Sequence, residues 1–135
     1  PLPPKGTVLG ATDKACCDEC PRERNVKKIK SFIRPFEKVT DPNLCLLEQG
    51  IVCMGPATRA GCGAKCVSAG MPCRGCYGLP SNVRDQGAKM VSAIGGVIDS
   101  SDPKEVQRII DSIPDPVGTF YRFSLPASML RRAQT

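Results

Sequence analysis

Hydrophobic residues recur at helical spacing before Pro35 and mark the first predicted helix of this 135-residue chain. Val26, Ile29, Phe32 and Ile33 follow one another at intervals typical of one helix face. Because proline cannot continue a helix, we expect the helix to end at Pro35. Basic residues fall mostly on its other side, where a solvated face is the default interpretation and a docking face for an acidic partner the alternative. They are Arg22, Arg24, Lys27, Lys28, Lys30 and Arg34.

A second helix is predicted over residues 82–100. Its apolar stripe consists of Ala88, Val91, Ile94 and Ile98. Two glycines at positions 95 and 96 weaken its end. We expect this helix to be scaffold without chemistry.

A third helix is predicted over residues 102–114, and its start is well signalled. Asp102 is the expected cap, Pro103 takes the first helical position, and Glu105 reaches back. Pro114 closes the helix. The expected buried stripe is Val106, Ile109, Ile110 and Ile113. This helix, too, is expected to be scaffold.

The stretch between Leu44 and Pro80 lacks such periodicity and is rich in cysteine, glycine and proline. Six of the nine cysteines lie there, and three precede it: Cys16, Cys17 and Cys20, then Cys45, Cys53, Cys62, Cys66, Cys73 and Cys76. A loop of this length without a cofactor would be unusual in a compact domain. We expect a mostly α fold with long irregular cysteine-rich loops and little or no β-sheet. The expected divisions are a connector (1–15), a cysteine region (16–80) and a helical scaffold with a docking tail (81–135).

Three chemistries could hold these thiols. Disulfide-bonded chains usually have an even number of cysteines, whereas this chain has nine. Zinc suits the two C-x2-C pairs, Cys17-x2-Cys20 and Cys73-x2-Cys76, but one four-thiolate site would leave four cysteines unused. Iron-sulfur clusters take four thiolates each, so eight cysteines would serve two clusters and leave one over.

The residues between the cysteines favour the cluster interpretation. Glycine lets the backbone approach a bulky cofactor and turn amides toward its sulfurs. Apolar side chains nearby would exclude water, which tunes the reduction potential of a cluster. The glycines are Gly55, Gly61, Gly63, Gly70, Gly75 and Gly78, and the apolar residues are Leu44, Leu46, Leu47, Ile51, Val52 and Met54.

Composition narrows the function further. The chain contains no histidine, which excludes histidine acid-base chemistry and histidine metal ligands. The formal charge of +6 only weakly indicates nucleic-acid binding, because the chain has no nucleic-acid recognition motif. Part of this positive charge could offset negatively charged clusters. No apolar run reaches the roughly 18 residues that a membrane span needs. Free thiols indicate a reducing compartment such as the cytoplasm.

The aromatic residues Phe120, Tyr121 and Phe123 could be core or could anchor a partner.

The order of the cysteines, together with CMGPATRAGCGAKC and MPCRGCYG, resembles the C-terminal half of the small subunit of [NiFe] hydrogenases. The cytoplasmic methyl-viologen-reducing type, which associates with heterodisulfide reductase in methanogens and some bacteria, is the most similar. The likeness covers nearly all of the chain, from LPPKGTVLG to the tail GTFYRFSLPASML.

This resemblance implies two [4Fe-4S] clusters. Cys17, Cys20, Cys45 and Cys53 would bind the distal cluster, and Cys62, Cys66, Cys73 and Cys76 the medial one. Cys16 could replace Cys17 as a ligand, although the C-x2-C spacing to Cys20 favours Cys17. No catalytic residue is expected in this chain.

The resemblance also implies partners. The chemistry of H2 would belong to a large subunit, and a flavodoxin-like domain with the proximal cluster would lie upstream or on a separate chain. Electrons would pass on through a small iron-sulfur subunit that leads to heterodisulfide reductase, with no nucleic acid or membrane involved. The alternative class is a structural zinc-binding interaction module without redox activity.

Overall fold

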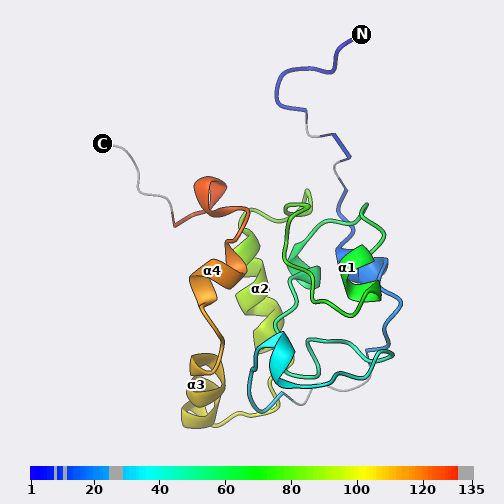
Figure 1. Ribbon diagram of the computed structural model, residues 1–135. Helices are drawn as coiled ribbons and strands as arrows, with labels where there is room; N and C mark the ends of the chain where they lie inside the picture. Colours follow the sequence, from blue (N-terminus) through cyan, green and yellow to red (C-terminus); the bar gives the residue numbers. More distant parts are fainter. Residues whose placement is uncertain (8, 11, 25–28, 131–135) are drawn as a thin grey trace.

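A computed structural model describes residues 1–7, 9–10, 12–24 and 29–130. Within these ranges, four short α-helices and four 3-10 turns are joined by long loops (Figure 1). The helices are α1 (Lys65–Ser68), α2 (Gln86–Gly95), α3 (Pro103–Asp111) and α4 (Pro116–Phe120). The 3-10 turns are η1 (Cys16–Asp18), η2 (Pro35–Glu37), η3 (Gly55–Ala57) and η4 (Leu125–Ala127).

The described residues form four isolated bridges and no β-sheet. The expected absence of a sheet is therefore confirmed for this part of the chain. Helical residues are a minority, so a mostly α fold overstates the helix content. The loops supply the core instead, because glycine and proline interrupt any periodic stretch between residues 44 and 80. No helix in the described ranges is long and apolar enough to cross a membrane.

Helix α2 lies at the centre of the molecule and packs against η3 and α4 (Figure 1). Asp85 caps it by accepting a 2.8 Å hydrogen bond from the N–H of Ala88. Its C-cap is Gly96, where the sequence predicted a weak end. The predicted stripe is wrong in part. Ala88 and Val91 are exposed, whereas Gln86, Gly87, Met90 and Ile94 are buried, because the helix turns a polar residue, Gln86, toward the cysteine loops.

Helix α3 begins as predicted. The Asp102 carboxylate accepts a 3.1 Å hydrogen bond from the N–H of Lys104, and Pro103 is the first helical residue. Glu105 does not reach back to the cap; it pairs with Arg108 at 3.4 Å on the exposed side. The predicted stripe is buried at Ile109 and Ile113, half-buried at Val106 and exposed at Ile110.

The helix predicted before Pro35 is wrong for the residues that the structure describes. Ile29 and Ile33 form parallel bridges to Ile98 and Ile51, with N–H···O distances of 3.3 Å to Val97 and 2.9 Å to Gly50. Their β-branched side chains favour such extended pairing, and the bridges bury Ile29 while leaving Ile33 half-buried. Val26, Lys27 and Lys28 lie outside the described residues.

The core consists largely of the loop residues that were expected to shield the thiols. Leu46, Leu47, Ile51, Val52 and Met54 are buried in one cluster with cysteine side chains, and Leu44 is half-buried. The aromatic residues near the C-terminus differ in burial. Phe120 is core, Tyr121 is half-buried, and Phe123 is 55% exposed.

Candidate functional site

All nine cysteines are free thiols, and all except Cys66 and Cys76 fall into two adjacent groups. We define the first group as Cys17, Cys20, Cys45 and Cys53. These four, together with Cys16, line one cavity of about 540 Å3 between η1, the loop at Leu46 and α2. Cys17 lies close enough to Cys53, Cys45 and Cys20 for their charges to interact. The structure therefore brings together the four residues that the resemblance assigned to one site.

Burial makes this cavity unfavourable for bare thiolates. It raises the pKa of Cys17 and that of Cys53 to about 12 each. The positive charge of Arg24 lowers the pKa of Cys17, and the backbone N–H groups of Gly55 and Cys73 lower that of Cys53. Burial outweighs these effects at both cysteines. Arg24 and Lys89 both line the cavity. Thiolates here need a compensating cation, as a bound metal group would supply.

Gly55 allows the close approach that was expected of a glycine in these loops. A β-carbon at position 55 would lie 2.9 Å from the Sγ of Cys17 and 3.7 Å from that of Cys53. A side chain would therefore enter the space that the two thiols face.

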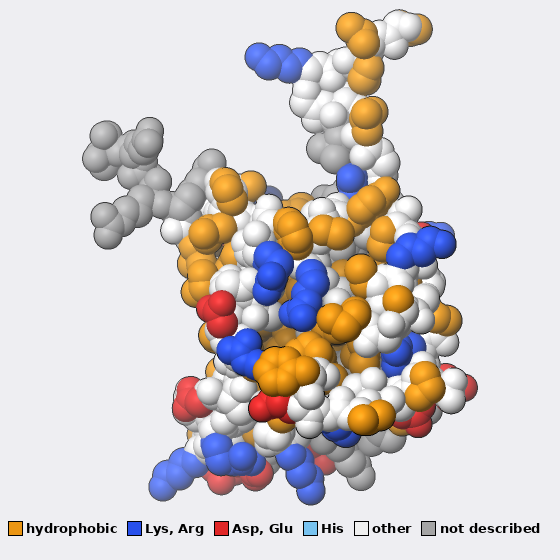
Figure 2. All heavy atoms as spheres, viewed as in Figure 1, with side chains coloured by type: hydrophobic (Ala, Val, Ile, Leu, Met, Phe, Trp, Pro, Cys, Tyr) orange, Lys and Arg blue, Asp and Glu red, His pale blue; other side chains and the backbone are white. Residues whose placement is uncertain are grey.

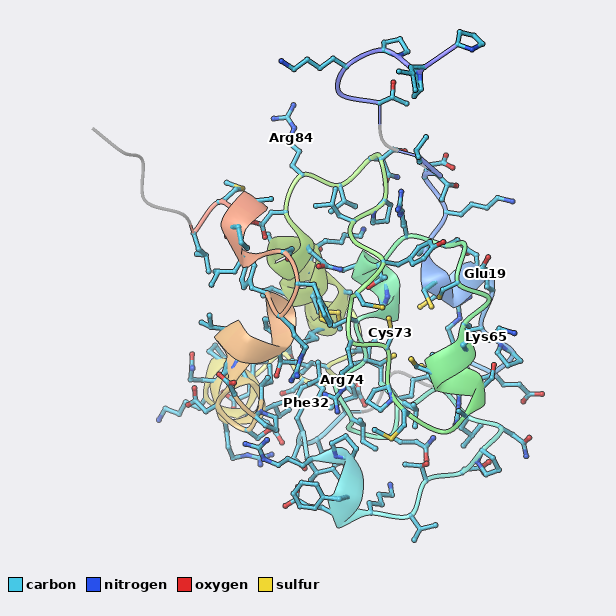
Figure 3. All side chains as sticks on the ribbon, turned by 45° about the horizontal axis from the view of Figure 1, so that its top comes forward. Glu19, Phe32, Lys65, Cys73, Arg74 and Arg84 are labelled. Carbon is cyan, nitrogen blue, oxygen red and sulfur yellow. The ribbon has the colours of Figure 1, made fainter. Side chains whose placement is uncertain are left out.

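The second group is centred on Cys73, which lies inside the protein in Figure 3. Cys16, also buried, lies next to Cys73 and Cys62. These contacts raise the pKa of Cys16, which keeps its proton, and lower that of Cys73. The Gly75 N–H also favours the Cys73 thiolate, whereas the Thr58 hydroxyl donates its proton to Met54 O at 2.6 Å. Cys66, on α1, and Cys76 are exposed, so the structure brings together only two of the four cysteines expected in this set.

Cys16 and Cys17 therefore face different groups. Cys17 lies in the first group, as the C-x2-C spacing to Cys20 favoured, and Cys16 lies in the second. The turn η1 separates adjacent side chains in this way because successive residues of a 3-10 helix point about 120° apart.

A single metal ion has no ready site. Within the described part, which includes all nine cysteines, no three Cys, Asp or Glu side chains are placed to hold one ion. Four thiols spread around a cavity, with backbone N–H groups directed at one of them, fit a larger inorganic group better than a tetrahedral ion.

Three polar residues that the sequence analysis did not assign to the site hold the loops around the thiols. The Glu19 carboxylate accepts hydrogen bonds from the N–H groups of Gly61 and Gly63, on either side of Cys62, at 3.0 and 2.9 Å. Gln86 donates to Gly75 O and to the Thr58 hydroxyl, both at 3.2 Å. The third residue is Arg22.

Arg22 was expected on a solvated face but is 7% exposed. Its guanidinium donates to the carbonyl oxygens of Val67, Asp41 and Leu44 at 3.1, 2.8 and 2.9 Å. These three bonds connect the segment after Cys20 with the loops that carry Cys45 and Cys66. Nothing in one sequence distinguishes this arginine from its exposed neighbours, because its partners are backbone atoms far along the chain.

Comparison with known proteins identifies relatives over most of the chain, although no family model matches it. A protein of Methanothermus fervidus, named as the G subunit of F420-non-reducing hydrogenase, is 44% identical over 118 residues, which is 84% of this chain and 93% of that protein. The protein of the same name in Methanothermobacter thermautotrophicus is 45% identical over 130 residues, which is 93% of this chain and 42% of its own length. One from Archaeoglobus profundus, named as the iron-sulfur G subunit of this hydrogenase, is 37% identical over 136 residues, which is 97% of this chain and 41% of its own length.

The chain thus spans about two fifths of the length of several curated relatives that it matches. It covers nearly all of the relative from Methanothermus fervidus at high identity. This chain therefore belongs to the family of F420-non-reducing hydrogenase G subunits.

Proposed function

We propose that this chain is the two-cluster, C-terminal part of the small subunit of a cytoplasmic [NiFe] hydrogenase of the type associated with heterodisulfide reductase. Cys17, Cys20, Cys45 and Cys53 would hold the distal [4Fe-4S] cluster, and Cys62, Cys66, Cys73 and Cys76 the medial one. The main support is the pair of adjacent thiol groups in a chain whose relatives include a named iron-sulfur subunit. For the medial set, Cys66 and Cys76 would have to turn inward from their exposed positions.

Such clusters, when bound, accept and release single electrons. The chain's own residues would bind them and exclude water. Leu46 and Leu47 line the first cavity and are buried. By excluding water they would raise the free energy needed to change the charge of a bound cluster. The N–H groups of Gly55 and Gly75 would donate to ligand sulfurs and so favour the more negative state. Arg24 and Lys89 add positive charge at the first cavity.

The two sites would be close enough to exchange electrons directly. The N–H of Cys73, in the medial set, donates a hydrogen bond to the Sγ of Cys53, in the distal set. Electrons released by H2 oxidation in a large subunit would enter through a flavodoxin-like proximal-cluster domain and leave toward a small iron-sulfur subunit. This chain would carry no catalytic residue and would bind neither nucleic acid nor a membrane.

Metal analysis and electron paramagnetic resonance (EPR) test this function. The protein, purified without oxygen, should contain roughly eight iron atoms per chain and little zinc, because two cubane clusters hold four irons each. Reduction with dithionite should produce the signals of two reduced clusters. Stoichiometric zinc without iron would refute the proposal and support the structural zinc module instead.

A further inference from the structure

A second hollow in the surface lies away from the first thiol group. Its volume is about 320 Å3, and it lies between η2, the loop around Cys73 and the turn that follows α4. We call it the arginine groove and define it by five of its lining residues: Arg34, Phe36, Met71, Arg74 and Arg122. Figure 2 shows basic side chains beside exposed hydrophobic ones over η2 on this face of the molecule.

The three arginines of the groove are free to bind a partner. Within the part of the chain that the structure describes, their guanidinium groups make no hydrogen bond or ion pair. Two acids lie there, and both are engaged by the backbone: Glu37 accepts from the N–H of Arg34, and Asp115, which itself lines the groove, accepts from that of Gly118 at 3.2 Å. Three guanidinium forks around one hollow are suited to carboxylates, which each fork can bind through two parallel hydrogen bonds.

The apolar residues of the groove favour a protein as its occupant. Phe36 is 82% exposed and Met71 is 49% exposed, and both line the groove. Aromatic residues, methionine and arginine are the types enriched in protein interfaces, whereas lysine is depleted there. All three cations that define the groove are arginine. A nucleic acid, in contrast, would be expected to face a longer basic stripe.

The groove also adjoins the second thiol group. Arg74 lies between Cys73 and Cys76, and Figure 3 shows it close to Cys73. Met71 begins the same loop. A protein bound in the groove would therefore contact the loop that carries two expected ligands of the medial cluster.

We propose that the arginine groove docks an acidic segment of another subunit of the hydrogenase complex, which presents Asp or Glu carboxylates to Arg74 and Arg122. The proposal rests on the proposed function for the identity of the complex, but not for the chemistry of the contact. Charge complementarity would orient the subunit, and Phe36 and Met71 would become buried against it.

Charge reversal in the assembled complex tests this proposal. The complex is purified without oxygen through a tag on this chain, carrying either Arg74→Glu with Arg122→Glu or, as a control, Arg84→Glu with Lys104→Glu. Arg84 projects away from the groove in Figure 3, and Lys104 is exposed on α3. The groove variant should retain one subunit at least about tenfold less well at moderate salt, because like charges now face each other. The control should retain it as the unchanged protein does.

Hydrogen exchange identifies the surface independently. Residues 34–37 and 71–76 should be protected in the complex relative to the isolated chain, and Lys substitutions in the partner's protected acidic segment should restore retention by the groove variant. Equal retention by both variants, or no protection at these residues, would overturn the proposal. So would groove-dependent binding of a short DNA duplex. Iron content, measured on the same samples, tests the two-cluster function separately and also shows whether each variant folds.

Discussion

The backbone N–H of Cys73 donates a hydrogen bond to the Sγ of Cys53 over 3.3 Å. The bond joins a residue of the second thiol group to a sulfur of the first, and both cysteines are buried. A second bond holds the same segments together, because the N–H of Met54 donates to the carbonyl oxygen of Cys73 at 2.9 Å. Since the contact uses the backbone of Cys73, its side chain remains available for the second group.

This geometry predicts that the two groups can be disturbed separately. Cys73→Ser should remove about half of the iron and the signal of the medial cluster, because serine keeps the N–H that reaches Cys53. Cys53→Ser should affect the distal signal instead. Iron analysis and EPR of the reduced protein measure both. Loss of both signals from Cys73→Ser would show that the grouping of the ligands is wrong.

Cys16 and Cys17 give a second prediction, because they face different groups. Cys17→Ala should lose the distal signal and about half of the iron. Cys16→Ala should keep both signals and all of the iron, because the proposed ligand sets do not require the ninth thiol. The same measurements apply to both variants. If Cys16→Ala instead lost the distal signal, Cys16 would be the ligand.

Gly55 is predicted to be essential for the first group. In Gly55→Ala the new methyl group would lie 2.9 Å from the Sγ of Cys17, too close without displacement of the thiol. We expect about half of the iron to be lost, as measured by iron analysis, with the second group retained. Gly95→Ala is the matched control, since no atom lies within 4 Å of its new methyl group. Alanine there should raise stability by up to about 1 kcal/mol, and a similar loss of iron from both variants would contradict the steric explanation.

Much of this arrangement could be predicted from the sequence, because its signals are local. The start of α3 depends on Asp102 and Pro103, which are neighbours, and its position was confirmed. Cys17 and Cys20 line the same cavity because they are only three residues apart, within a single turn. The burial of the apolar residues from Leu46 to Met54 follows from their composition.

The features that sequence reasoning missed depend on distant partners. Ile29 and Ile33 have the spacing of a helix, but pairing with Ile98 and Ile51 decides their conformation. The burial of Arg22 depends on carbonyl groups of residues 41, 44 and 67. The buried face of α2 includes a polar residue, Gln86, beside Met90 and Ile94, because the Gln86 side chain donates to the carbonyl oxygen of Gly75. Contacts between residues far apart in the sequence cannot be recognised from the periodicity of a single sequence.

The guanidinium of Arg22 is predicted to stabilise the fold. Arg22→Met would remove three hydrogen bonds from a buried guanidinium, although each carbonyl keeps a second donor, Gln49 Nε2 or the N–H of Gly70. The variant should lower the free energy of unfolding by about 3 kcal/mol. Arg22→Lys should recover only part of this, because lysine lacks the planar fork that reaches several acceptors. Denaturant unfolding under nitrogen, followed by circular dichroism, measures the change. Arg84→Met, at an exposed site, should have little effect, and an equal loss from both positions would contradict the role of these bonds.

Asp85 is predicted to make the stability depend on pH. Its burial would raise the pKa of the carboxyl, but hydrogen bonds from the N–H groups of Ala88 and Met129, the hydroxyl of Tyr121 and the N–H of Gly87 outweigh burial and lower the pKa. Because the folded pKa lies below the unfolded one, the stabilisation is full above the ordinary carboxyl pKa of about 4. It is lost as the pH falls from there through the lowered folded value.

Asp85→Asn isolates this contribution. The amide can accept only through its single oxygen, so we expect a loss of about 1–3 kcal/mol at neutral pH. Unfolding midpoints of the unchanged protein and the variant should differ most at neutral pH and converge as the pH falls below about 4. Tyr121→Phe is the control, since it removes one 2.8 Å bond and keeps the helix cap. A difference between the unchanged protein and the Asp85→Asn variant that stayed constant down to low pH would show that Asp85 acts through shape and not through its charge.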